Sequence, residues 1–131
     1  MTHQDIAFGA LCAWRENRGG GNEGMMSILN VLRNRAELHG TSVYFEATKP
    51  FQFSSLTYRD DPQLTVFPSE DDTQWRVALA LASQEVLSDI TGGATNYYSL
   101  LMEKPPYWAA YMERTCVIAN QAFYKLQARN A

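Results

Sequence analysis

The run of three glycines at Gly19–Gly21 separates two stretches whose apolar residues recur at helical spacing, and it constrains the fold more than any other feature. Residues 3–17 and 22–39 each place apolar side chains on one face, which predicts two consecutive helices that help to form the core. Because glycine accepts backbone conformations that other residues avoid, the run predicts a tight reversal between them. The apolar positions are Ile6, Phe8, Ala10, Leu11, Ala13 and Trp14 in the first stretch and Met25, Ile28, Leu29, Leu32 and Ala36 in the second.

Capping residues mark the ends of both expected helices. Thr2 followed by Asp5 is typical of a helix start, because each side chain can satisfy a free backbone N–H of the first turn. Asn22 is expected to cap the second helix, and Gly40 is expected to end it.

The middle of the chain predicts less regular structure. A short helical turn fits residues 42–47, and residues 48–68 then read as loop because Pro50, Pro62 and Pro68 interrupt them. Such a long loop is uncommon in a compact domain and points to function. Ser69 and Asp72 predict the start of a further helix, which carries apolar residues from Trp75 to Leu87.

The last forty residues predict a small β element. The segment "TGGATNYYSL" at 91–100 indicates a glycine turn that leads into a short strand. Residues 115–126 fit either a hairpin that turns near Asn120 or a last helix, and we favour the hairpin. The expected fold class is therefore α+β, mainly helical with a small antiparallel β element.

Composition predicts one globular domain over residues 1–131, a length that can bury a core without metal or disulfide support. The net charge is −3 and no run of Lys or Arg occurs, so a nucleic-acid partner is not expected. No apolar stretch approaches the roughly 18 to 20 residues of a membrane span, and the N-terminal segment lacks the basic start of a signal peptide. We expect a monomer that does not insert into a membrane.

Cysteine and histidine placement gives no sign of a metal site. Cys12 and Cys116 lie far apart in apolar contexts, without metal-ligand spacing, and are expected to be buried free thiols. His3 and His39 stand at the terminus and before a glycine, where neither is a convincing ligand or base. No metal or organic cofactor is indicated.

Two glutamates flank the glycine run, and the residues alone leave the role of both open. Glu16 ends an apolar helix, where the helix dipole and an apolar surround would favour the protonated acid that glycosidic cleavage requires. Arg15 and Arg18 could instead pair with it and lower its pKa. Glu23 stands in the first turn of the next helix, where a carboxylate simply suits the dipole.

Other polar and aromatic residues also allow two interpretations. Gln52 and Ser54 in "FQFSSL" could hydrogen-bond a sugar, although turn capping explains them as well. Aromatic rings at Tyr97, Tyr98, Tyr107 and Trp108 could stack on sugar faces or fill the core.

Several segments, in one order, resemble a known family. The stretch "ENRGGGNEGMMSILNVLRNR" at 16–35 is similar to the opening motif and the Asn-Arg-ending helix of the SleB-type cell-wall hydrolases, the spore-cortex lytic enzyme family. The resemblance continues through "QFS" at 52–54, "TGGA" at 91–94, the tyrosine pair, Trp108 and "IANQAFY" at 118–124, and it spans roughly residues 7 to 125. Departures from the family pattern occur at Trp14, Arg15, Gly20, Ser99 and Gln121.

This resemblance implies a lysozyme-like fold and cleavage of peptidoglycan between N-acetylmuramic acid and N-acetylglucosamine. It implies that Glu16 is the catalytic acid of a lytic transglycosylase, which needs no second carboxylate. A hydrolase with Glu23, Asp60 or Asp61 as partner acid stays open, as does a non-catalytic glycan-binding virion protein. The substrate-binding residues that we expect are Glu23, Gln52, Ser54, Gly93, Tyr97, Tyr98 and Trp108.

The biological setting is an expectation as well. A bare catalytic domain without signal peptide or wall-binding module suits a bacteriophage endolysin, made in the host cytoplasm and released to the wall at lysis. Reduced cysteines agree with that compartment. A virion-associated wall-piercing role is the other option, with peptidoglycan glycan strands as the partner in both cases.

Overall fold

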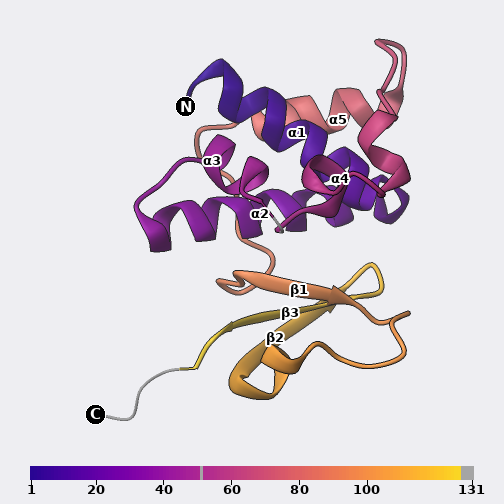
Figure 1. Cartoon of the computed structure of the whole chain (residues 1–131). Coiled ribbons are helices and arrows are strands. Elements are labelled where there is room, and N and C mark those ends of the chain that lie inside the picture. Colours follow the sequence, from indigo (N-terminus) through magenta and orange to yellow (C-terminus); the bar gives the residue numbers. More distant parts are fainter. Residues whose placement is uncertain (51, 128–131) are drawn as a thin grey trace.

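A layer of helices lies against a three-stranded antiparallel sheet in the computed structural model, which describes residues 1–50 and 52–127 and, at Ser54, the backbone alone (Figure 1). This confirms the predicted fold class. The elements are α1 (His3–Asn17), η1 (Arg18–Gly20), α2 (Gly21–His39), α3 (Val43–Thr48), α4 (Ser54–Thr57), η2 (Pro62–Thr65), α5 (Thr73–Ala82), β1 (Asn96–Ser99), η3 (Tyr107–Tyr111), β2 (Met112–Ile118) and β3 (Gln121–Leu126).

The two expected N-terminal helices are present. Both ends of the first helix and the end of the second are confirmed. Thr2 and Asp5 form a reciprocal capping box at the start of α1, and Gly40 ends α2 in a left-handed conformation. The predicted cap at Asn22 was wrong. The single turn η1 already brings the chain into a helical path, so α2 begins at Gly21 and its N-cap, Gly20, has no side-chain hydrogen bond.

The segment predicted as loop is more ordered than expected, since it contains α4 and η2. The side chain of Asp72, rather than that of Ser69, caps α5 by accepting from Trp75 N at 3.0 Å. This helix ends at Ala82, so the predicted continuation to Leu87 was wrong and Val86 is exposed. Beyond Ala82 the backbone instead turns to follow α2.

Side chains of α2 hold that returning segment in place. Asn30 donates to Ser88 O and accepts from Ile90 N, both at 3.0 Å. Asn34 donates to Ala94 O at 2.9 Å and to the carboxylate of Asp89. Because these contacts fix residues 88–94 along the helix, they fix the point at which β1 begins.

The C-terminal hairpin is confirmed over the alternative helix. The sheet order is β1-β3-β2, with Tyr97 opposite Phe123 across the first pair of strands. Ala119 and Asn120 form the turn between β2 and β3, and both have a positive φ. Asparagine tolerates this conformation, whereas alanine is strained in it.

One hydrophobic core joins the helical layer to the sheet. Its buried members include Trp14 and Leu29 from the helices, Phe53 from the segment before α4, and Phe123 from β3. Cys12 is a buried free thiol as expected, and Cys116 is free and partly buried. Within residues 1–50 and 52–127, no helix has the length and apolar character needed to cross a membrane.

Candidate active site

Glu16 lies in the last turn of α1 and faces the sheet. Its Oε1 accepts a 3.2 Å hydrogen bond from the phenol of Tyr97 on β1. The Tyr97 ring is held between Phe53 and Phe123, at centroid distances of 6.4 and 5.6 Å. The carboxyl group of Glu16 therefore sits where the two layers meet.

The surroundings of Glu16 raise its pKa above the ordinary glutamate value. Burial is the main cause, and the nearby negative charge of Asp61 acts in the same direction. The Tyr97 hydrogen bond and the adjacent Ser55 hydroxyl lower the pKa in part. The Ser55 Oγ is buried and has no partner within normal hydrogen-bond geometry, so we assign it the smaller effect. Glu16 can thus hold a proton closer to neutral pH than an exposed glutamate can.

The two arginines that flank Glu16 in sequence are engaged elsewhere. Arg15 donates to Val66 O at 3.0 Å and to Ser55 O at 2.9 Å. Arg18 donates to Trp14 O at 3.1 Å, and its guanidinium lies 4.0 Å from the centre of the Trp14 ring. The alternative of a helix-end glutamate paired with an arginine does not occur in the described contacts.

Two cavities adjoin Glu16. The first has a volume of about 510 Å³, and the second of about 580 Å³. Glu16 lines both of them. The first cavity is lined by Glu16, Arg35, Gln52, Phe53, Tyr58, Asn96, Tyr97, Tyr107 and Trp108. The second is lined by Glu16, Asn17, Gly19, Gly20, Ser99, Leu101, Ala119, Asn120 and Gln121.

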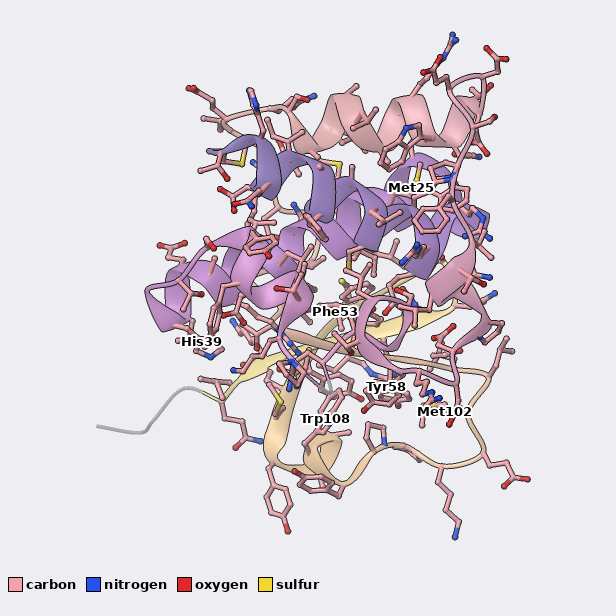
Figure 2. All side chains as sticks on the ribbon, turned by 45° about the horizontal axis from the view of Figure 1, so that its top comes forward. Met25, His39, Phe53, Tyr58, Met102 and Trp108 are labelled. Atoms are coloured by element: carbon pink, nitrogen blue, oxygen red, sulfur yellow. The ribbon has the colours of Figure 1, made fainter. Side chains whose placement is uncertain are left out.

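The first cavity combines aromatic surface with polar groups. Figure 2 shows Phe53, Tyr58 and Trp108 gathered in one region of the molecule, although they come from separate segments. Gln52 is exposed, and its side-chain oxygen accepts from Arg35. Such a mixture of rings and amide groups suits a sugar, which offers both apolar faces and hydroxyl groups.

Tyr98 supports this cavity from behind rather than lining it. Its ring stacks on Tyr124 at 5.7 Å, and it meets Trp108 edge-on at 6.0 Å. Arg114 donates to the hydroxyl groups of both tyrosines at 3.2 Å. Tyr97 and Trp108 line the cavity as described, whereas Tyr98, which was also predicted to contact substrate, is not among its described lining residues and packs against Trp108 instead.

Two other predicted residues, Glu23 and Gly93, are not among the residues described as lining the Glu16 cavities. Glu23 is exposed in the first turn of α2 and lines neither cavity. Gly93 has a φ of 86°, and its N–H donates to Asp89 in the turn before β1. The side chain of Ser54 lies outside the described residues. A substrate contact by these three stays a prediction.

Glu16 is the only carboxylate among the residues described as lining either cavity. Asp60 is exposed. Asp61 is half-buried and caps η2 by accepting from Gln63 N at 2.8 Å, and its charge acts on Glu16 without lining the cavities. No cluster of three or more potential metal ligands occurs in the described part of the chain.

The sequence did not single out several residues of the two cavities. Arg35, Tyr58 and Asn96 line the first cavity. In the second, Asn17 Nδ2 donates to Gln121 Oε1 at 3.0 Å, although the two residues are 104 positions apart. Asn17 and Arg35 fall within the resembling stretch at 16–35, and Gln121 falls within "IANQAFY", where it departs from the family pattern.

Comparison with solved structures places the fold. The catalytic domain of the germination-specific lytic transglycosylase SleB from Bacillus anthracis matches with a TM-score of 0.73 and 22% identity, over 95% of this chain and 97% of that chain. The SleB catalytic domain from Bacillus cereus matches with a TM-score of 0.70 and 23% identity, over 95% and 92% of the two chains. The chain has the fold of the SleB catalytic domain. No protein-family model matches the sequence, and no curated protein matches it with significance.

Proposed function

We propose that this chain is a peptidoglycan-cleaving lytic transglycosylase in which Glu16 is the general acid and base. The observation that carries the proposal is the half-buried Glu16 carboxyl, with its raised pKa, at the junction of two cavities. The fold shared with two SleB catalytic domains supports the same reaction class. The substrate is the glycan strand, cleaved between N-acetylmuramic acid and N-acetylglucosamine.

In the proposed mechanism one carboxyl group serves twice. Glu16 donates its proton to the glycosidic oxygen as the bond to the muramyl C1 breaks, and an oxocarbenium-like or acetamido-stabilised species forms. The resulting Glu16 carboxylate then accepts the proton of the muramyl 6-hydroxyl, whose oxygen bonds to C1. The product carries a 1,6-anhydro ring, no water is consumed, and Glu16 ends protonated as it began.

The surroundings of Glu16 fit this double role. An acid that must first give and later take a proton works best with a pKa near the working pH. Burial moves the pKa of Glu16 in that direction, while Tyr97 keeps the carboxylate form accessible. The cavity rings and Gln52 would orient the sugar on one side of the scissile bond.

Product analysis tests the proposal most directly. Purified protein is incubated with isolated peptidoglycan, and the soluble fragments are examined by mass spectrometry. Anhydro-muramyl ends are expected. The Glu16→Gln variant should lose activity by at least about 10²- to 10⁴-fold while it remains folded; full activity in that variant would exclude Glu16 as the acid.

A muramidase of the same fold is the second candidate, because the charge of Asp61 does act on Glu16. Such an enzyme would use a second carboxylate to activate water or to stabilise the cation, and it would leave reducing ends. A non-catalytic glycan-binding virion protein would pull down sacculi without lowering the turbidity of permeabilised cells.

We also propose the setting expected from the sequence, an endolysin that acts on the wall from the host cell at lysis, with a virion-associated role as the alternative. The free thiols of Cys12 and Cys116 support folding in a reducing compartment. Expression of the chain in a host cell, alone and with a membrane-permeabilising partner, tests it: lysis that requires permeabilisation is expected.

A further inference from the structure

Arg35 contributes the only cationic side chain among the residues described as lining the first cavity, and the proposed mechanism does not use it. It lies near the end of α2, four positions before His39, and contacts the residue just before β1 and the segment before α4. Its guanidinium lies 5.3 Å from the centre of the Phe53 ring. The group is therefore held in the wall of the cavity that contains Glu16.

Two hydrogen bonds to described residues orient the Arg35 guanidinium. Its Nε donates to Thr95 O, and its Nη1 donates to Gln52 Oε1, both at 2.5 Å. Arginine has five N–H donors, and the remaining three make no hydrogen bond in the described part of the chain. The Gln52 contact is exposed and Arg35 lines the cavity, so a ligand bound there can approach the guanidinium.

The charge of Arg35 also lacks a direct counter-ion. None of the ion pairs described in the chain includes it. The carboxylate of Glu46 acts on it through the protein, but Glu46 is fully buried and accepts from Thr41 Oγ1 at 2.6 Å, with His39 Nδ1 3.1 Å away. When Glu16 is protonated as the general acid, Arg35 is therefore the only charged side chain among the residues described as lining the first cavity.

We propose that Arg35 recognises a carboxylate of the substrate and so selects muramyl-containing glycans over neutral ones. This inference rests on the proposed function. Two carboxylates of peptidoglycan have the required chemistry: the lactyl carboxylate of muramic acid in strands without peptide, and the carboxylates of the stem peptide. The planar guanidinium, oriented by Thr95 and Gln52, presents paired N–H donors to either.

The test measures binding by the Glu16→Gln variant, so that ligands are not consumed. Four soluble ligands of matched length are titrated: peptide-free glycan strands, peptide-bearing uncross-linked strands, and the methyl ester of each. Esterification removes the charge and leaves the sugar intact. The acid of at least one pair should bind roughly 10- to 100-fold more tightly than its ester. The pair that shows the difference identifies the carboxylate.

A second variant assigns the effect to Arg35. In the Arg35→Gln protein the difference between acid and ester should disappear, because the acid should lose more affinity than the ester does. Arg35→Lys keeps the charge without the planar fork and should retain only part of the difference. Arg33→Gln is the matched control, because Arg33 lies on the same helix and bonds backbone carbonyls outside the cavity; it should keep the full difference.

Contrary outcomes are separable. Equal affinity of acid and ester in both pairs, or a difference that persists in Arg35→Gln, would overturn the proposal, and so would equal weakening of acid and ester by Arg35→Gln. The comparison of acid with ester needs no Arg35 variant, so it still tests whether a substrate carboxylate is recognised if the Arg35 variant does not fold. Failure of the proposed function shows instead as the absence of peptidoglycan cleavage by the wild-type protein, a separate measurement.

Discussion

The phenol of Tyr97 donates a hydrogen bond to Glu16 Oε1 across 81 positions of sequence. This contact ties the end of the first helix to the first strand, and it is one of the interactions that set the pKa of Glu16. The neighbouring Tyr98 has no such contact, because its hydroxyl lies against Tyr124 and Arg114. Adjacent residues of one strand thus serve opposite faces of the sheet.

Tyr97→Phe is expected to shift the alkaline limb of the pH–activity profile toward higher pH. The hydrogen bond from Tyr97 lowers the pKa of Glu16, so its loss lets the acid keep its proton at higher pH. The initial rate of peptidoglycan release, measured from pH 4 to 9, gives the profile. Tyr98→Phe removes a hydroxyl from the next residue and should leave the limb where it is. An unchanged limb in Tyr97→Phe would mean that Glu16 is not the titrating acid.

Glu16→Gln is expected to make the protein more stable at neutral pH. The pKa of Glu16 is raised in the folded state, so its stabilising contribution is present below the unfolded pKa and is lost as pH rises through the folded pKa. Glutamine cannot ionise and avoids that loss. Thermal unfolding should give a higher Tm for the variant at pH 7, and the two proteins should converge below about pH 4. A lower Tm at pH 7 would contradict the burial of this carboxyl.

Asp61→Asn separates an electrostatic role from a catalytic one. The negative charge of Asp61 raises the pKa of Glu16, so its removal should move the alkaline limb toward lower pH with little loss at the optimum. Asparagine can still cap η2, and Asp60→Asn is the exposed neighbouring control. A loss of about 10²-fold or more at every pH, together with reducing-end products, would favour the hydrolase.

Gly20→Ala is expected to destabilise the junction between the helices and the hairpin by about 1 to 3 kcal/mol. A Cβ at Gly20 would lie 2.7 Å from both the Cβ of Ala119 and Oδ1 of Asn17. At Gly19 a Cβ meets nothing within 4 Å, so Gly19→Ala is the matched control. Urea unfolding measures the stability of both variants. Equal midpoints would show that the turn at Ala119 can move to accommodate the added Cβ at no cost in stability.

Ala119→Gly is expected to stabilise the hairpin by about 1 kcal/mol, because alanine is strained at its φ of 48° and glycine is not. The free energy of unfolding measured in urea checks the change. Ala36→Gly in the helix α2 should have the opposite sign, since glycine weakens a helix interior by about 1 kcal/mol. Destabilisation by Ala119→Gly would contradict the turn conformation.

Local patterns predicted much of the fold. The capping box at Thr2 and Asp5, the end of α2 at Gly40 and the hairpin turn near Asn120 were all readable, because each depends on residues only a few positions apart. The predicted Asn22 cap and the predicted extension of α5 to Leu87 were wrong, because both were inferred from local sequence alone. A turn of η1 and the return of the chain along α2 override local preference there.

The sequence by itself determined that Glu16 would lie near the end of a helix, and that a glycine turn would separate it from Glu23. Only the tertiary structure distinguished the two acids. It placed the half-buried Glu16 against the phenol of Tyr97, brought the charge of Asp61 near it, and left Glu23 in solvent. It also placed Arg35 in the same cavity. Burial, cavity shape and pKa depend on residues that are distant in sequence, and helical periodicity and capping carry no information about them.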